Sequence, residues 1–169
     1  LKPGIIYAGT DDGNLHVTLD DGETWTDLTE KLPMPADRFF TRIFCSSHDA
    51  NTVFVAAARY YEANDYSPYL FMSRDNGNTW KSLSDNLPGA AIVKGLAQHQ
   101  LNGDLIFAGT HNGLYMSKDS GITWSHIQGE LPPVAIDDIK IKMPENHLIL
   151  GSYGRGIIIH DDIDKLVGK

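Results

Sequence analysis

Thr18-Leu-Asp20-Asp-Gly22-Glu-Thr24-Trp25 is the first of three copies of one eight-residue pattern in this chain. The other copies are Ser73-Arg-Asp75-Asn-Gly77-Asn-Thr79-Trp80 and Ser117-Lys-Asp119-Ser-Gly121-Ile-Thr123-Trp124. All three share Ser or Thr, Asp, Gly, Thr and Trp at fixed spacing. The pattern predicts the turn of a β-hairpin, because an Asp carboxylate accepts backbone N–H groups, Gly adopts positive φ and a buried Trp anchors the turn.

The repeat extends beyond this turn. Four segments run from bulky apolar residues into small ones: Ile6-Tyr-Ala-Gly-Thr10, Val53-Phe-Val-Ala-Ala57, Ile106-Phe-Ala-Gly-Thr110 and Ile149-Leu-Gly-Ser-Tyr153. Each segment predicts a strand whose side chains become smaller toward one end, where strands crowd toward the axis of a β-propeller. A second strand is expected after each of them, at 15–19, 69–74, 114–118 and 157–160.

Two further strands complete each repeat. Short outer strands are expected at positions such as 25–28 and 80–83, and inner strands at 40–46, 93–98 and 139–143. Proline closes the outer strands in the tripeptides Lys31-Leu-Pro33, Asn86-Leu-Pro88 and Glu130-Leu-Pro132. A turn or two of helix is expected only at 162–167.

The sequence therefore predicts an all-β fold: a β-propeller segment of about three and a half four-stranded antiparallel blades. The first blade lacks its inner strand and the fourth lacks its outer one, so we expect a fragment of a larger propeller. Residues 1–169 form a single partial propeller domain in this interpretation. Its repeats are expected at approximately 4–33, 39–88, 92–132 and 137–162.

The eight-residue pattern resembles the Asp-box, or BNR, repeat of sialidases, xyloglucanase-type glycoside hydrolases and sortilin-type receptors, which are β-propellers. The turn Gly154-Arg-Gly156, with the apolar strand and Asp161-Asp162 after it, resembles the last blade of bacterial sortilin-like or BNR glycosyl hydrolase proteins. The resemblance implies a secreted or periplasmic location. It indicates fold more strongly than reaction, because repeat motifs report packing.

Composition narrows the classes of function. The chain has 169 residues, of which 41% are apolar and 21% charged, and it contains no apolar run long enough to span a membrane. A net charge of −8 without clustered Lys and Arg argues against binding to nucleic acid. Cys45 is the only cysteine, which excludes an intrachain disulfide, and we expect it to be a buried small residue on an inner strand.

Metal and cofactor signatures are missing from the sequence. The seven histidines include no close-set pair like those of zinc motifs, and the acidic turns lack the alternating oxygen ligands of an EF-hand. No metal site and no obligatory cofactor are predicted. The nucleophile-elbow pattern Gly-x-Ser-x-Gly does not occur either.

Binding groups are expected at one end of the blades. In an antiparallel blade, the turn between the second and third strands lies opposite the Asp-x-Gly-x-Thr-Trp turn. We call this end the loop face: the turns 11–13, 59–68, 111–113 and 153–156, with the blade connections near 38, 94 and 137. Loops held by a rigid scaffold can bring polar groups together there.

Candidate ligand-binding residues follow from this placement. Tyrosine rings can stack on a sugar or a peptide, and a guanidinium can bind a carboxylate through two hydrogen bonds. The candidates are Arg59, Tyr60, Tyr61, Glu62, Tyr66, His111, Asn112, Tyr153 and Arg155. Structural roles stay open for them: the tyrosines of 59–68 can pack on a neighbouring blade, and Arg155 can hold a neighbouring loop.

Two functions follow. One is a binding or scaffold module for a glycan or a peptide, as the resemblance to sortilin-like propellers implies. The alternative is part of a glycoside hydrolase: xyloglucanase-like, with paired loop carboxylates, or sialidase-like, with Arg38, Arg59 and Arg155 as a carboxylate-binding triad. The catalytic candidates are Asp11, Asp12, Glu62 and Asp137, with Asp65 and Asp138 as further acids, although turn chemistry alone explains Asp11 and Asp12.

The expected partners are a glycan or peptide ligand, with no nucleic acid and no membrane insertion. Open blade edges also predict self-association, because an unpaired strand edge offers free backbone donors and acceptors.

Overall fold

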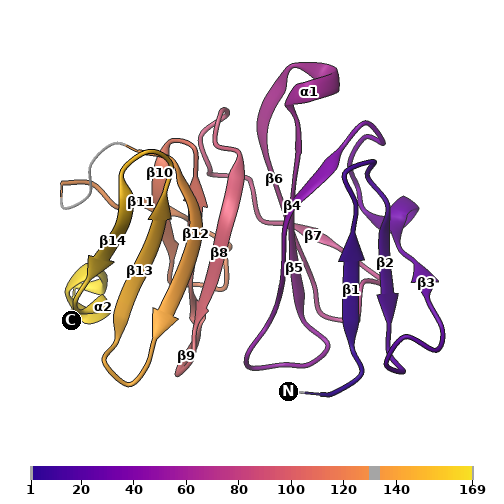
Figure 1. Ribbon diagram of the computed structural model, residues 1–169, viewed down its shortest axis with the longest axis horizontal. Helices are drawn as coiled ribbons and strands as arrows, with labels where there is room; N and C mark the ends of the chain where they lie inside the picture. Colours follow the sequence, from indigo (N-terminus) through magenta and orange to yellow (C-terminus); the bar gives the residue numbers. More distant parts are fainter. Residues whose placement is uncertain (1, 130–133, 169) are drawn as a thin grey trace. The chain divides into compact units, whose positions relative to one another are not determined.

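The computed structural model describes residues 2–129 and 134–168, except for the side chain of Glu62. Strands dominate this part of the chain, with two short α-helices and one 3-10 helix among them. The chain divides into two compact units, Leu1–Ala90 and Ala91–Lys169, and each contains two antiparallel sheets (Figure 1). Within the described residues, no helix has the length and apolar character needed to cross a membrane.

The N-terminal unit contains a three-stranded and a four-stranded sheet, with orders β1-β2-β3 and β4-β5-β6-β7. In both sheets, strands that are neighbours in the chain are also neighbours in space. The elements are β1 (Ile6–Gly9), β2 (Leu15–Thr18), β3 (Thr26–Asp27), η1 (Thr29–Lys31), β4 (Phe39–Cys45), β5 (Val53–Arg59), α1 (Tyr60–Ala63), β6 (Asp65–Ser73) and β7 (Lys81–Ser82).

The C-terminal unit also holds one four-stranded and one three-stranded sheet, with orders β11-β10-β9-β8 and β12-β13-β14. Its terminal helix confirms the helical turn expected at 162–167. The elements are β8 (Val93–His99), β9 (Asn102–Thr110), β10 (Gly113–Ser117), β11 (Ser125–His126), β12 (Ile136–Lys142), β13 (His147–Ser152), β14 (Gly156–His160) and α2 (Ile163–Val167).

This strand pattern confirms the predicted fold class. Two four-stranded sheets lie between two three-stranded ones in chain order, and the described part of the first sheet lacks the inner strand. The described part of the last sheet lacks the outer strand. The outer strands β3, β7 and β11 contain two residues each, so they are shorter than the strands expected at 25–28 and 80–83. In the first sheet, β3 ends at Asp27 and η1 begins at Thr29. The third proline tripeptide, Glu130–Pro132, lies outside the described residues.

The segment 59–68 differs from the long turn that the sequence predicted. Strand β5 continues to Arg59, which pairs with Asp65 at the start of β6, and α1 lies at the tip of this longer hairpin (Figure 1). Asn64 has a left-handed φ of 51°, which reverses the chain after α1. The extra residues therefore lengthen a hairpin instead of forming an irregular loop.

Small residues lie where neighbouring sheets approach closely. A Cβ atom at Gly9 would lie 2.8 Å from Cδ1 of Ile43, and one at Gly109 would lie 2.6 Å from the backbone oxygen of Ile136. Glycine near the ends of β1 and β9 therefore makes room for a neighbouring strand. Each unit has its own apolar core, which includes Leu15, Val53 and Phe71 in the N-terminal unit.

Two burial expectations need correction. Cys45 is exposed, because it ends β4, the edge strand of its sheet. Trp25 is 46% exposed, although Trp124 is 6% exposed as expected. The first turn has no packing neighbour at its glycine, since a Cβ added to Gly22 would find no atom within 4 Å. In the second turn, by contrast, Gly77 packs against Leu28 of the preceding sheet.

Candidate functional site

Each Asp-x-Gly-x-Thr-Trp turn is closed by the same set of hydrogen bonds. In the first turn, the Asp20 carboxylate accepts the backbone N–H of Thr24 at 2.9 Å and its hydroxyl at 2.5 Å. The Thr18 hydroxyl donates to Asp20 at 2.7 Å and accepts the N–H of Gly22 at 2.9 Å. The equivalent distances in the other two turns lie between 2.6 and 2.8 Å. The turn is thus built from local bonds, which explains its exact repetition.

These bonds also set the charge of the turns. The pKa of Asp20 and that of Asp119 fall to about 2, chiefly because the hydroxyl of the Thr four residues later donates to the carboxylate. The pKa of Asp75 also falls to about 2, with the backbone N–H of Thr79 as the largest cause. All three carboxylates are stabilised in the ionised form, which suits a structural role.

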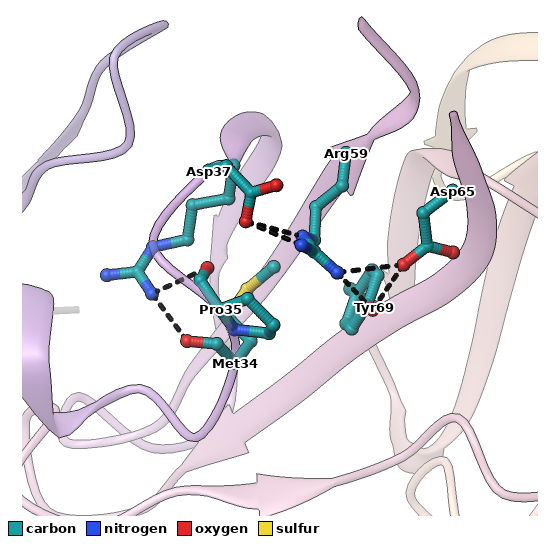
Figure 2. Close-up of polar contacts among 7 residues, drawn as sticks. Met34, Pro35, Asp37, Arg59, Asp65 and Tyr69 are labelled. Carbon is teal, nitrogen blue, oxygen red and sulfur yellow. Dashed lines mark hydrogen bonds and ion pairs between the residues drawn. The ribbon is translucent and has the colours of Figure 1, made fainter. Parts of the chain in front are cut away.

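On the loop face of the N-terminal unit, the Arg59 guanidinium lies between two carboxylates (Figure 2). Its Nε and Nη2 donate to Oδ1 of Asp37 at 3.0 and 2.5 Å, and its Nη1 donates to Oδ2 of Asp65 at 3.0 Å. The hydroxyl of Tyr69 donates to the same Asp65 oxygen at 2.7 Å. The pKa of Asp65 falls to about 2, with Tyr69 as the largest cause. Arg59 therefore already binds two carboxylates of its own chain.

Four aromatic rings gather beside this ion-pair network, and we call them the aromatic platform: Phe39, Tyr60, Tyr61 and Tyr66. The ring centroids of Tyr60 and Tyr61 are 4.3 Å apart, and each lies 5.1 Å from that of Phe39. Tyr60 and Tyr66 are stacked at 6.0 Å. Tyr61 is 74% exposed and Tyr66 is 46% exposed, so part of the platform faces solvent.

Arg38 does not take part in this surface. It is 5% exposed, and its guanidinium donates to the backbone oxygens of Gly13, Thr29, Met34 and Pro35 at 2.6–3.2 Å. Burial lowers the pKa of Arg38. An arginine used in this way cannot belong to the carboxylate-binding triad considered for a sialidase-like enzyme.

The acidic turn 11–13 has the bonding of an ordinary turn. Asp12 accepts a short hydrogen bond from the hydroxyl of Thr10, and this bond lowers the pKa of Asp12. The Thr10 hydroxyl also accepts the backbone N–H of Asn14 at 3.0 Å. Asp11 is exposed in the same turn. The side chain of Glu62, the third catalytic candidate of this unit, lies outside the described part.

In the C-terminal unit, the structure places His111 near Lys94, and Lys94 pairs with Asp137. The His111 Nδ1 accepts the backbone N–H of Ile92 at 3.1 Å, and Lys94 forms an ion pair with Asp137 at 3.1 Å. The pKa of His111 falls below its usual value, first because of burial and second because of the Lys94 ammonium. Asn112 is exposed, and its backbone N–H bonds the Thr110 hydroxyl at 3.1 Å.

The turn 153–156 presents the remaining candidates. Tyr153 is 76% exposed, and its backbone N–H bonds the oxygen of Ala135 at 2.9 Å. Arg155 is exposed between Gly154 and Gly156, which have φ values of 80° and 72°. Both side chains are accessible to a ligand.

Three residues of the N-terminal site are not among the candidates predicted from the sequence: Asp37, Phe39 and Tyr69. Asp37 adjoins Arg38 in a blade connection assigned to the loop face, so its position was a usable signal. Tyr69 lies inside a predicted strand, and Phe39 lies just before one. Their contacts with 59–66 depend on the register of the β4, β5 and β6 pairing. The described residues contain no cluster of three His, Cys, Asp or Glu that could hold a metal ion.

Comparison with known proteins identifies the fold. No family model matches the chain, and no curated protein matches it in sequence. A GH74 enzyme of Niastella koreensis superimposes with a TM-score of 0.71 over 95% of this chain at 20% identity. The GH74 xyloglucanase from Xanthomonas campestris superimposes with a TM-score of 0.62 over 88% of this chain at 19% identity. YCF48 bound to D1 peptide superimposes with a TM-score of 0.62 over 94% of this chain at 20% identity.

The chain spans only part of each of these structures: 27% and 24% of the two GH74 chains and 48% of YCF48. Structural similarity at such low sequence identity establishes the fold and not the activity. The chain has the β-propeller fold, of which it forms a segment with four antiparallel sheets.

Proposed function

We propose that this chain is part of an Asp-box β-propeller that serves as a binding or scaffold module, and that the loop face of its N-terminal unit binds a glycan or a peptide. The aromatic platform carries the proposal. Tyr61 exposes 74% of its surface while its ring contacts those of Phe39 and Tyr60. An exposed ring held by other rings loses little conformational entropy when a ligand stacks on it.

The ion-pair network adjoins the platform in the chain, because Arg59 directly precedes Tyr60. Arg59 bonds Asp37 in the connection before β4 and Asp65 at the start of β6, so it ties that connection to the β5–β6 hairpin whose tip contains α1. Tyr69 adds a bond to Asp65 from within β6. Because these bonds all form within the N-terminal unit, we expect the platform to be in place before a ligand arrives.

The carboxyl groups of Asp12, Asp65 and Asp137 have environments that favour binding over catalysis. A glycoside hydrolase needs one carboxyl group with a raised pKa to protonate the leaving group. Asp12 and Asp65 have lowered pKa values, and Asp137 is ion-paired with Lys94. A glycoside hydrolase nevertheless stays the second proposal, because GH74 enzymes share this fold and more than half of each such chain has no counterpart here.

Other surfaces are secondary proposals. His111, Asn112, Tyr153 and Arg155 are proposed ligand contacts of the C-terminal unit. Self-association is proposed through the edge strands β1 and β14, where Ile6, Ile157 and Ile159 are 44%, 73% and 56% exposed.

The test is a binding screen of the purified chain against immobilised glycans and a peptide library. The double variant Tyr61→Ala/Tyr66→Ala removes the exposed rings, and Leu101→Ala removes an apolar side chain that is 80% exposed elsewhere. We expect hits that the double variant loses and Leu101→Ala retains. Hits that survive in the double variant would place binding outside the platform. Release of reducing ends from xyloglucan by the wild-type chain would support the hydrolase instead.

A further inference from the structure

The carboxylates beside the aromatic platform outnumber the cation that pairs with them. Asp37 and Asp65 share the single guanidinium of Arg59, which leaves one net negative charge in the network. Both oxygens of Asp65 are already engaged: Oδ1 accepts the N–H of Ser67 at 2.9 Å, and Oδ2 accepts from Arg59 and Tyr69. The structure thus leaves Asp37 as the carboxylate with capacity for a further partner.

Asp37 has both the free atom and the exposure for this. Within the part of the chain that the structure describes, its hydrogen bonds and its ion pair all use Oδ1. The Asp37 side chain is 41% exposed, compared with 22% for Asp65. Oδ2 of Asp37 is therefore an available acceptor on the solvent side of the network.

The platform presents an exposed ring at the same end of the β4–β5 ladder as the ion pair of Asp37 with Arg59. Phe39 follows Asp37 by two residues and lies 5.1 Å from Tyr61 between ring centroids. Phe39 also pairs with Ala58, the neighbour of Arg59, so the ring cluster and the ion pair share one end of the β4–β5 ladder. A cation placed over an aromatic face is attracted by the ring quadrupole, and a neighbouring carboxylate adds an ion pair.

We propose that this site binds the side chain of lysine or arginine in a peptide, with the Tyr61 ring under the cation and Oδ2 of Asp37 as its hydrogen-bond acceptor. This inference rests on the proposed function and narrows it to a basic peptide. Charge complementarity carries it: an anionic sugar would meet Asp37, while the cation of Arg59 is already engaged by two carboxylates. The net charge of −8 also favours the approach of a cationic ligand.

The ring geometry argues against a flat neutral sugar. Tyr61 is inclined by 36° to Phe39 and by 52° to Tyr60, so the three rings do not form one plane. A cation needs only one accessible ring face, whereas a flat chain of sugar units that stacks on Phe39, Tyr60 and Tyr61 together would need these three rings to share one plane. Tyr61, which is exposed and lies at the same end of the β4–β5 ladder as Asp37, meets the first requirement.

The test is calorimetric titration of the whole chain with three probes in 150 mM salt: acetyl-Lys-Arg-Lys-Arg-amide, acetyl-Glu-Glu-Glu-Glu-amide and cellotetraose. We expect only the basic peptide to bind. Tyr61→Ala should weaken it about two- to fivefold, and Tyr61→Phe, which keeps the ring, should not. Asp37→Asn should also weaken it about two- to fivefold. Asp161→Asn removes the same charge from an exposed site in the other unit and should leave the affinity unchanged.

Each other outcome has a defined meaning. Equal losses in Asp37→Asn and Asp161→Asn would overturn the inference, because the peptide would then respond only to total charge. Full affinity in Tyr61→Ala would also overturn it. If cellotetraose binds in a Tyr61-dependent way and the basic peptide does not, the inference falls and the proposed function stands. If the basic peptide does not bind, the inference falls; if the glycan and peptide screen is also empty, the proposed function falls with it. Thermal unfolding of each variant confirms that it is folded.

Discussion

A Cβ atom added to Gly77 would lie 2.3 Å from Cδ1 of Leu28, so the second Asp-x-Gly-x-Thr-Trp turn fits directly onto the preceding sheet. Lys31 adds a polar link, since its Nζ donates to Oδ1 of Asn78 in the same turn at 2.8 Å. In the N-terminal unit, the turn therefore has two structural tasks. It closes its own hairpin through local bonds, and it packs one sheet against the next.

This contact predicts unequal effects for two similar substitutions. Gly22 and Gly77 both have positive φ, 97° and 86°, so alanine causes comparable backbone strain at either site. Only Gly77→Ala also clashes with Leu28, which is 1% exposed and has little room to move. We expect Gly77→Ala to lower the free energy of unfolding by about 1–3 kcal/mol more than Gly22→Ala does. Equal losses in chemical denaturation would contradict the packing role.

The three turn aspartates predict acid sensitivity. Their folded-state pKa values of about 2 lie below the ordinary value of 3.8, so the unfolded chain binds protons first as the pH falls. Their contribution to stability is therefore complete above about pH 4 and is lost between about pH 4 and pH 2. The triple variant D20N/D75N/D119N should melt at a lower temperature at pH 7 and show a smaller further decrease over that acid range. If the melting temperature of the triple variant falls as much as that of the wild type over this pH range, the acid sensitivity arises from other groups.

Much of the fold was predictable because its signals are local. The bonds of an Asp-x-Gly-x-Thr-Trp turn join residues two or four positions apart, so a short pattern specifies them. By contrast, Arg59 and Asp37 are 22 residues apart and meet only when β4 pairs with β5 in the observed register. The Arg59 ion pairs, the ring contacts of Phe39 and the exposure of Cys45 depend on such tertiary detail, which no local pattern specified.

Arg38 predicts a large loss of stability on substitution. Replacement by methionine preserves much of the length but leaves the oxygens of Gly13, Thr29 and Met34 without this donor. Since Arg38 is buried, we expect a loss of about 3 kcal/mol in the free energy of unfolding. Arg155→Met, at an exposed turn, should change it by less than about 0.5 kcal/mol. Similar values for both variants would contradict the structural role of Arg38.

The hydrogen bond to His111 predicts a second dependence of stability on pH, at higher pH than that of the turn aspartates. Its Nδ1 accepts the Ile92 N–H, which requires a neutral ring, and its pKa lies below the usual 6.5. The stabilisation is therefore complete above about pH 6.5 and decreases as the pH falls toward the folded-state pKa. His111→Asn offers a non-titrating acceptor in place of Nδ1 and should show a smaller loss of melting temperature between pH 6.5 and 5. The same loss in wild type and variant would disprove this role.

The proposed binding surface is tested most directly by the tyrosine ring signals in the NMR spectrum of the isotopically labelled chain, recorded while a ligand from the binding screen is added. We predict that the ring signals of Tyr61 and Tyr66 shift in proportion to ligand occupancy. Shifts confined to Tyr153, or a bound ligand that leaves Tyr61 and Tyr66 unchanged, would contradict the assignment of the aromatic platform as the binding site.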